Sequence, residues 1–383
     1  MHIAVIGAGA FGGWTALALR RRGARVTLVD AWGPGNTRSS SGGETRVIRA
    51  TYGTRDIYTK MAMRAMELWR DYDVDRTLLR TAGVLWMLQR DDGFGRASVE
   101  TLRASGLRID ELTPRDAAAR FPQIDMGRVT SALWEPDAGY LFARRACASV
   151  VERFVAEGGE YRQSAATAPV ALDGRSLTRL PLQGGGALDA DAFVFACGPW
   201  LGSLFPDTLG SLVSVTRQEV YYFGTPAGDA RFVDPAMPVW LDYGERVMYG
   251  IPGNAYRGFK IADDTSGPPM DPTTGSRDVT AAGVAAVRTF LERRFPALAG
   301  APLLGSEICQ YESTPDAHFV IDRHPAAENV WIAGGGSGHG FKMGPAIGEH
   351  LATCVLDAGD VYAPFTLGRF ARPPAGGWEK KWS

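Results

Sequence analysis

The first 30 residues restrict the fold more than any other part of the chain. An apolar run at 2–6 is typical of a short buried strand, and a stretch of helical composition at 13–22 precedes a second apolar run at 25–30. Between the first run and the helical stretch stand three glycines, Gly7, Gly9 and Gly12. A tight turn, a close backbone approach and helix packing each require a residue without Cβ. The spacing therefore predicts a strand-helix-strand unit with a ligand at the start of the helix.

Asp30 ends the second predicted strand and restricts the ligand. The start of the helix would present free N–H groups and a positive dipole to a pyrophosphate. A carboxylate 18 residues after Gly12 can accept hydrogen bonds from both hydroxyls of a ribose, and it would repel a 2′-phosphate. We therefore expect a dinucleotide without a 2′-phosphate, and the motif by itself fits NAD and FAD equally.

The composition excludes several classes of partner. Among 383 residues, 41 Lys and Arg stand against 42 Asp and Glu, giving a net charge of −1. The chain therefore lacks the positive field that gathers nucleic acid or anionic lipid, and we expect neither as a partner. Its 45% hydrophobic and 22% charged residues are those of an ordinary globular protein, and its length favours two domains.

The four cysteines indicate neither a metal site nor a disulfide framework. Cys147, Cys197, Cys309 and Cys354 lie far apart and form no CxxC pair, so we expect no bound metal. No apolar run reaches the roughly 18 residues that a membrane span needs. No cationic region precedes residues 2–6, as it would in a signal peptide. A cytoplasmic protein is expected.

Apolar periodicity predicts further helices and strands along the chain. Helices are expected over 56–72, 142–157, 278–294 and 341–357, and strands over 83–88, 191–198, 305–311, 318–322 and 329–333. Short strand-like runs recur at hairpin spacing between 214 and 262, which indicates an antiparallel sheet. Pro- and Gly-rich stretches at 265–276 and 373–377 predict a loop and a fraying tail.

Three separated segments resemble one family of flavoproteins. They are residues 43–53 (GETRVIRATYG), 309–322 (CQYESTPDAHFVID) and 333–342 (AGGGSGHGFK). In this order they resemble segments of monomeric sarcosine oxidase and its N-methyltryptophan oxidase relatives, in the D-amino-acid-oxidase superfamily. The resemblance runs from residue 1 to residue 357 and is loose over 60–300. It implies an α/β fold, with a Rossmann-like FAD-binding domain of the glutathione-reductase type and a substrate domain built on an antiparallel sheet.

The resemblance also implies how the domains divide and what they do. The FAD-binding domain would comprise residues 1–80, 140–215 and 315–383, and the substrate domain residues 81–139 and 216–314. The implied activity is oxidation of a secondary or N-methylated amino acid to an imine by hydride transfer to FAD. Hydrolysis of the imine and reduction of oxygen to hydrogen peroxide would follow. A monomer acting on a small-molecule amine and oxygen is expected.

Four cations match functional positions of the family. Arg49 matches the residue that binds the substrate carboxylate, and Lys342 matches its second contact, a compact charge beside a planar guanidinium. Arg46 matches an arginine over the flavin, and two guanidiniums so close would repel unless an anion lay beside them. Lys260 matches a lysine near the flavin, where a cation favours negative charge on oxygen. The alternative for Lys260 is an outward-facing charge on a strand.

Cys309 matches the cysteine that carries the flavin through a thioether to its 8-methyl group. Such a bond requires a thiolate, so basic neighbours are expected. This chain has Ser39 to Gly42 where the family often carries histidine, so FAD binding and covalent attachment are separate predictions. The resemblance assigns further cofactor contacts to Thr45, Gly336, Gly338 and Gly340.

Three residues match positions in the substrate pocket. Tyr249 and Tyr311 would orient the amine with aromatic side chains. Asp264 stands four residues after Lys260, where the sarcosine-oxidising members have a histidine. An anion there is expected to favour a substrate with a second cationic or hydroxyl group. The alternative is a shifted loop in which Asp263 and Asp264 are both solvated.

Three other functions remain compatible with the sequence. An oxidase of a cyclic imino acid resembling pipecolate, or of another amine in secondary metabolism, would differ only in the shape of the pocket. A flavin dehydrogenase would pass its electrons to an acceptor other than oxygen. An NAD-binding or nucleotide-sensing protein would explain the N-terminal motif but would leave Cys309 and the glycine-rich segment at 333–342 without a role.

Overall fold

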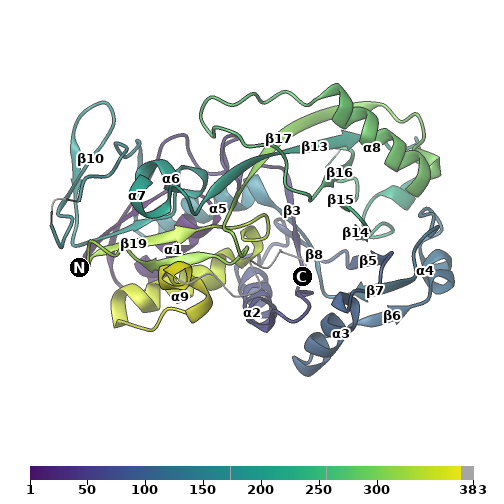
Figure 1. Ribbon diagram of the computed structural model, residues 1–383, viewed down its shortest axis with the longest axis horizontal. Helices are drawn as coiled ribbons and strands as arrows, with labels where there is room; N and C mark the ends of the chain where they lie inside the picture. The colour runs from purple at the N-terminus through teal and green to yellow at the C-terminus, as the bar shows by residue number, and fades with distance from the viewer. Residues whose placement is uncertain (173, 256, 372–383) are drawn as a thin grey trace.

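A six-stranded sheet organises the N-terminal and C-terminal parts of the chain in the computed structural model, which describes residues 1–172, 174–255 and 257–371 (Figure 1). Its order is β18-β19-β12-β1-β2-β9, and all neighbours are parallel except β18 and β19. The strands are β1 (His2–Ile6), β2 (Arg25–Asp30), β9 (Glu160–Gln163), β12 (Ala192–Phe195), β18 (Val320–Arg323) and β19 (Val330–Gly334). Short strands with almost wholly buried residues form its centre, as expected of a parallel sheet covered on both faces.

Helices cover one face of this sheet, where Ile3 and Val5 point. They are α1 (Ala10–Arg21), α2 (Asp56–Tyr72), α5 (Ala143–Ala156) and α9 (Gly344–Asp357). A Cβ on Gly348 would lie 2.6 Å from the backbone oxygen of Trp14, so a glycine is needed where α9 crosses α1. Ala4 and Ile6 point to the opposite face, where α6 (Leu201–Leu204) and α7 (Pro206–Leu209) pack with the β10 (Arg179–Pro181) and β11 (Ala187–Asp189) hairpin.

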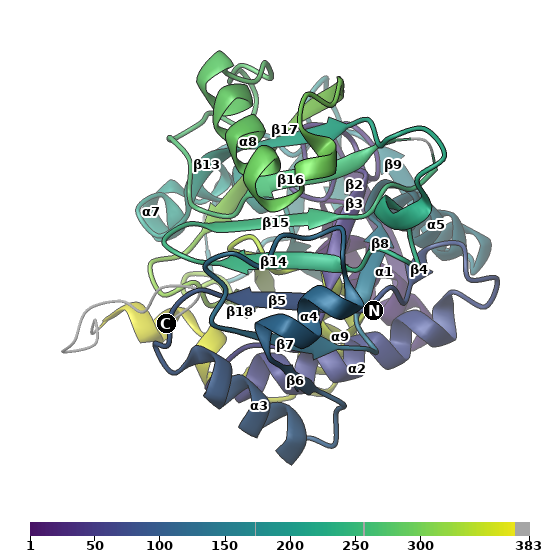
Figure 2. The same ribbon diagram turned by 90° about the vertical axis from the view of Figure 1, so that its right-hand side faces the viewer.

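A second sheet of eight strands has the order β17-β13-β16-β15-β14-β5-β7-β6 (Figure 2). Its strands are β5 (Val84–Leu88), β6 (Asp110–Leu112), β7 (Ser131–Glu135), β13 (Ser214–Phe223), β14 (Val239–Tyr243), β15 (Val247–Ile251), β16 (Phe259–Asp263) and β17 (Leu303–Ser313). All pairs are antiparallel except β14 with β5. Helix α8 (Ala281–Arg294) packs on one face through Val287, Phe290 and Leu291.

A small three-stranded sheet lies between the two large sheets in Figure 1. It consists of β3 (Thr45–Ile48), β8 (Gly139–Phe142) and β4 (Leu79–Arg80). Because β3 carries Thr45 and Arg46 and ends next to Arg49, this sheet brings the predicted cations to the junction of the two large sheets.

Most predicted elements are present, although some of their bounds differ. The helix expected at 13–22 begins earlier, at Ala10, and the helix expected at 341–357 is a 3-10 turn at Phe341–Met343 followed by α9. Periodicity predicts no separate range for several elements, among them α3 (Phe94–Ala104), α4 (Pro114–Arg120) and β7, whereas β14 falls within the antiparallel stretch predicted at 214–262. The tail predicted at 373–377 lies outside the described residues. In the described part of the chain, no helix combines the length and the apolar character that crossing a bilayer requires.

Candidate active site

A cavity of about 630 Å³ runs from the end of β1 and β2 to the start of α9. Thirteen of the residues predicted for the site line it, namely Gly7, Gly9, Asp30, Arg46, Arg49, Tyr249, Asp264, Cys309, Tyr311, Gly336, Gly338, Gly340 and Lys342. Gly12, Thr45 and Lys260 do not line it. The fold therefore gathers residues from both ends of the chain and from the antiparallel sheet around one space.

The glycine turn is built as its spacing predicts. Gly7 has φ +103°, a conformation that other residues rarely adopt. A Cβ on Gly12 would lie 1.8 Å from the backbone oxygen of Gly7, so no side chain fits there. These constraints bring the first turn of α1 to the cavity wall, where a helix N-terminus favours a phosphate.

Asp30 lies at the cavity, and its carboxylate also holds the turn together. The carboxylate accepts backbone N–H groups from Ala8 at 2.8 Å, Trp32 at 2.9 Å and Gly33 at 2.7 Å. Burial raises the pKa of Asp30, and these three donors oppose that rise. The sequence indicated a ribose contact, whereas the bonds to the loop after β2 become visible only in the folded chain.

Two buried cations also line the cavity. Arg49 is 3% exposed and its Cζ lies 4.4 Å from the ring centroid of Tyr52 and 5.0 Å from that of Trp86. Lys342 is 4% exposed and its Nζ donates to the hydroxyl of Tyr52 and to the carbonyl of His339, both at 2.9 Å. Buried cations at a cavity wall suit an anionic ligand such as a carboxylate.

Arg46 and Cys309 are in direct contact at the cavity. The guanidinium Nη2 of Arg46 lies 3.2 Å from Sγ of Cys309 and donates to the carbonyl of Ser40 at 2.7 Å. Cys309 belongs to β17 and Arg46 to β3, so only the folded chain makes this pair.

Lys260 lies behind the cavity wall rather than on it. The side chain is 1% exposed, and its Nζ donates to the carbonyl of Thr45 at 2.8 Å. Burial, assisted by the positive charge of Arg46, lowers the pKa of Lys260 to about 7. Protonation of this residue therefore changes near neutral pH.

Asp264 and the two tyrosines form a polar group on the cavity wall. The hydroxyl of Tyr311 donates to Oδ1 of Asp264 at 2.8 Å. Burial and the neighbouring Asp264 raise the pKa of Tyr311 well above its ordinary value, and burial raises that of Tyr249. Asp263 instead pairs with Arg246 near the surface, so the two adjacent aspartates have different surroundings.

Sequence reasoning missed Glu135, which holds the segment after Arg49. Its buried carboxylate accepts the N–H of Ala50 and the hydroxyl of Thr51, and burial raises its pKa. An acid at the end of an otherwise apolar strand, 131–135, is the signal that could have identified it.

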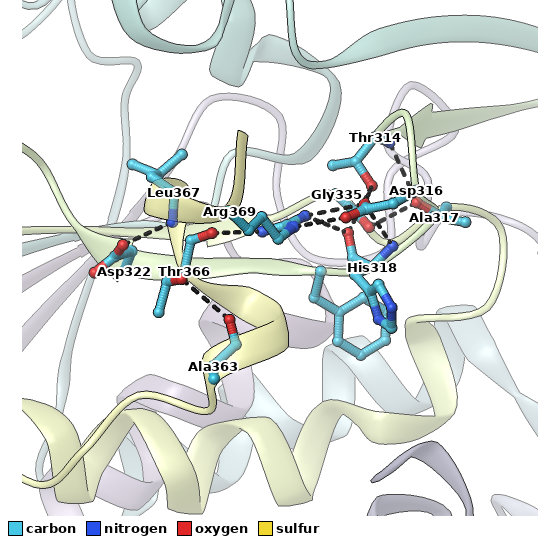
Figure 3. Close-up of polar contacts among 12 residues, drawn as sticks. Thr314, Asp316, Ala317, His318, Asp322, Gly335, Ala363, Thr366, Leu367 and Arg369 are labelled. Atoms are coloured by element: carbon cyan, nitrogen blue, oxygen red, sulfur yellow. Dashed lines mark hydrogen bonds and ion pairs between the residues drawn. The ribbon is translucent and has the colours of Figure 1, made fainter. Parts of the chain in front are cut away.

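The loop after β17 is fastened by the C-terminal segment (Figure 3). Arg369 points at Asp316, with Nε 2.7 Å from Oδ2, and also donates to the carbonyl of His318 at 3.2 Å. Within the loop, the hydroxyl of Thr314 donates to the same carbonyl at 2.6 Å. The next carbonyl back, that of Ala317, contacts Nε2 of His339 at 3.0 Å, which links this loop to the glycine-rich wall of the cavity.

The residues present fit FAD. The cavity wall carries a glycine turn, a helix start and two buried cations, which suits a dinucleotide and its small-molecule partner. Gly7 and Gly9 on this wall carry no Cβ, which lets a phosphate approach the backbone closely. Arg46 and Cys309 reach the same cavity from β3 and β17.

Comparison with known proteins also indicates an FAD-binding protein. The profile of the FAD dependent oxidoreductase family named DAO matches residues 2–353. Monomeric sarcosine oxidase from Bacillus sp. strain B-0618 is 29% identical over 364 residues, covering 92% of each chain. N-methyl-L-tryptophan oxidase from Salmonella dublin is 26% identical over 377 residues, covering 96% of this chain and 98% of the other. The crystal structure of L-proline dehydrogenase from P. horikoshii superposes with a TM-score of 0.84 at 21% identity, over 99% of both chains, and shows the shared fold.

A family match over most of the chain, on a fold that carries the family's glycine turn, decides the class of protein. The chain belongs to the DAO family of FAD dependent oxidoreductases, and it is an FAD-dependent enzyme that oxidises amines.

Proposed function

We propose that the protein oxidises a secondary or N-methylated amino acid and passes the electrons to oxygen. The observation that carries this proposal is the pair of buried cations, Arg49 and Lys342, on the wall of the same cavity as the glycine turn. Two adjacent cations suit a carboxylate, and the names of the relatives, sarcosine oxidase and N-methyltryptophan oxidase, support an N-methylated substrate.

The proposed reaction needs position and charge from the protein rather than a strong base. FAD, when bound, supplies a two-electron acceptor for the hydrogen that leaves the carbon next to nitrogen. Arg49 and Lys342 would hold the carboxylate and so fix the position of this carbon. The amine would enter as its free base, after losing its proton to solvent. The imine then takes up water and splits into an amine and a carbonyl compound, while oxygen takes two electrons and two protons to give hydrogen peroxide.

We propose that Cys309 carries the FAD as a thioether. The contact between its Sγ and Arg46 at 3.2 Å supports this attachment, because a cation there would stabilise negative charge on sulfur during bond formation. The new C–S bond would replace one C–H bond of the 8-methyl group, the proton would leave to solvent, and the two electrons released would pass through the flavin to oxygen. Acid precipitation tests this attachment, because yellow colour that stays with the precipitate requires a covalent bond.

Asp264 is proposed to restrict the substrate. Its carboxylate and the hydroxyl of Tyr311 lie on the cavity wall. An anion there favours a substrate with a second cationic or hydroxyl group, so plain sarcosine is expected to be a poorer substrate than larger N-alkyl amino acids that carry such a group.

We also propose that the chain is a monomer with an FAD-binding domain and a substrate domain. Residues 1–80, 140–215 and 315–383 would bind FAD, with 81–139 and 216–314 closing over the substrate. The six-stranded and eight-stranded sheets draw their strands from these two sets, which supports the division. The name of the monomeric relative supports a monomer. A location in the cytoplasm stays a prediction from the sequence.

Anaerobic mixing with a panel of N-methyl amino acids tests the function. Loss of flavin absorbance with a carboxylate-bearing amine, but not with the same amine lacking the carboxylate, is expected. Arg49→Ala should raise the apparent KM about 100-fold, because a hydrogen bond between charged groups is lost, and should leave the flavin content unchanged. Unchanged kinetics would refute the carboxylate site, and rapid reduction followed by slow reaction with oxygen would identify a dehydrogenase instead.

A further inference from the structure

We infer that Tyr52 is a positioning residue that orients the two cations of the carboxylate site, Arg49 and Lys342. This inference rests on the proposed function. Tyr52 is 5% exposed and does not line the cavity. Its ring faces Arg49, whose Cζ lies 4.4 Å from the ring centroid, and its hydroxyl accepts a hydrogen bond from Lys342 at 2.9 Å. One side chain therefore touches both cations from behind.

The direction of the hydrogen bonds follows from what each atom can do. The carbonyl of Ala317 can only accept, so Nε2 of His339, 3.0 Å away, must carry the proton. If His339 is neutral, Nδ1 then has a lone pair, and it lies 3.4 Å from the hydroxyl of Tyr52. Tyr52 donates to this nitrogen and accepts from the ammonium of Lys342. The bonds thus run one way from Lys342 through Tyr52 and His339 to Ala317.

The protonation state of Tyr52 agrees with this direction. Burial raises the pKa of Tyr52 to about 12, although the nearby Arg49 opposes the rise. The phenol therefore keeps its proton at neutral pH and can donate to His339.

An aromatic alcohol suits this position better than an acid would. Two neighbouring cations repel each other, and the negative face of an aromatic ring and a hydroxyl lone pair both relieve that repulsion. A carboxylate at position 52 would also neutralise the two cations and compete with the carboxylate of the substrate. Tyr52 orients Arg49 and Lys342 and leaves their charge for the ligand.

The backbone around Lys342 is fixed as well. The indole N–H of Trp69 donates to the carbonyl of Lys342 at 2.9 Å, and Lys342 donates to the carbonyl of His339 within the same turn. Because the backbone is held, loss of the Tyr52 hydroxyl should change the direction of the ammonium and not the path of the chain.

Binding of methoxyacetate to the flavin-loaded protein tests the inference. This carboxylate has the size of sarcosine but an ether in place of the amine, so it can bind without reacting, and the flavin spectrum reports its Kd. Tyr52→Phe keeps the ring over Arg49 and should weaken binding about tenfold, since it removes a hydrogen bond to a charged group. Tyr52→Leu removes the ring as well and should weaken binding further.

Tyr58→Phe is the matched control. Its ring centroid lies 5.3 Å from that of Tyr52, and its hydroxyl contacts Nδ1 of His318 and the backbone N–H of Phe319 instead of Lys342. This variant also loses a buried hydroxyl, yet its Kd for methoxyacetate should equal that of the wild type. Flavin content and Tm verify that each variant is folded.

A double-mutant cycle separates positioning from general damage. In a Lys342→Met background, Tyr52→Phe should have no further effect on Kd, because the cation that it orients is gone. With a carboxylate-bearing amine substrate, Tyr52→Phe should raise KM and leave kcat at saturation within about twofold. Equal Kd values for wild type and Tyr52→Phe, or an undiminished effect in the Lys342→Met background, would overturn the inference.

Failure of the proposed function has a different signature. If the wild type itself does not bind methoxyacetate, the carboxylate site is wrong and the role of Tyr52 falls with it. If the wild type binds methoxyacetate and the Tyr52 variants bind it with the same Kd, the proposed function stands and this inference alone fails. Should Tyr52→Phe lose its flavin, Tyr52→Leu replaces it, and wild-type affinity in that variant would contradict the inference.

Discussion

At the scale of single residues, burial changes the acid–base behaviour of the side chains around the cavity. The ammonium of Lys260 is surrounded by protein, and the nearest cation is Arg46. Desolvation disfavours its charge, so its pKa falls to about 7, whereas the same effect raises the pKa of the neutral phenol of Tyr52. A lysine that titrates near neutral pH supplies a positive charge only on the acidic side of that value.

Lys260→Met should slow the reaction of the reduced enzyme with oxygen about 100-fold, since one preorganised cation is lost beside the developing negative charge. Reduction by substrate under anaerobic conditions should change much less. In the wild type the oxygen step should slow as the pH rises through about 7, where Lys260 loses its proton, and the variant should lack this dependence. Stopped-flow measurement of each half-reaction separates the two steps. An equal loss in both half-reactions would contradict a role confined to oxygen.

At the scale of elements, short segments far apart in the sequence fasten the cavity wall. The 3-10 segment Leu367–Ala371 carries Arg369, which binds Asp316 in the loop between β17 and β18. Burial by itself would raise the pKa of Asp316, but the guanidinium of Arg369 brings it below the ordinary value. The side chains are 12% and 10% exposed, so this ion pair is largely shielded from solvent.

Arg369→Gln should therefore destabilise the protein by about 2 kcal/mol at pH 7, because Asp316 stays charged without its partner. An acid whose pKa is lowered by folding contributes stability above its ordinary pKa of about 4, and the contribution disappears as the pH falls through the lower folded value. The difference in Tm between wild type and variant should thus narrow below about pH 4.

Arg179→Gln provides the control for this experiment. Arg179 and Asp189 form an ion pair of similar length, 2.8 Å, but with 68% and 64% of the two side chains exposed. Its loss should change Tm little at either pH. Calorimetry that finds the same small effect for both variants would show that Arg369 does not fasten the loop.

At the scale of the whole molecule, the cavity is formed by the two large sheets together. The glycine turn follows β1, Cys309 lies on β17, and Arg49 follows β3 of the small sheet between them. A ligand that fills this cavity touches all three sheets. Its binding should therefore stabilise the molecule as one unit, by an amount set by its concentration relative to its Kd.

Cys309→Ser tests this statement, because under the proposed attachment it makes the FAD removable. The variant should be yellow, release its flavin into the acid supernatant, and show a lower Tm after the flavin is removed by dialysis. Addition of FAD at 100 times its Kd should restore about 2.7 kcal/mol. Flavin in the supernatant of the wild type as well would contradict the covalent bond, and a Tm independent of FAD would contradict binding across the sheets.

Sequence patterns predicted the turns and helices that are fixed by sterics or by apolar periodicity within a few residues. The turn at Gly7 to Gly12 follows from sterics within a few residues, and the amphipathic helix at 56–72 follows from its own periodicity. Helix α3 was missed, because it starts from a glycine without a side-chain cap. Strand β14 falls within the antiparallel stretch predicted at 214–262, without a range of its own. The family resemblance, rather than composition or periodicity, selected the candidate cations.

The sequence by itself determined the nucleotide-binding turn, the family and the set of residues to be considered for the site. Only the tertiary structure decided which of them meet. The contact between Arg46 and Cys309 spans 263 positions and that between Tyr52 and Lys342 spans 290. The fold also decided that Tyr52 supports Arg49 and that Glu135 holds the segment after Arg49. Local sterics act over a few residues, whereas burial, pKa and charge pairing depend on which distant segments pack together.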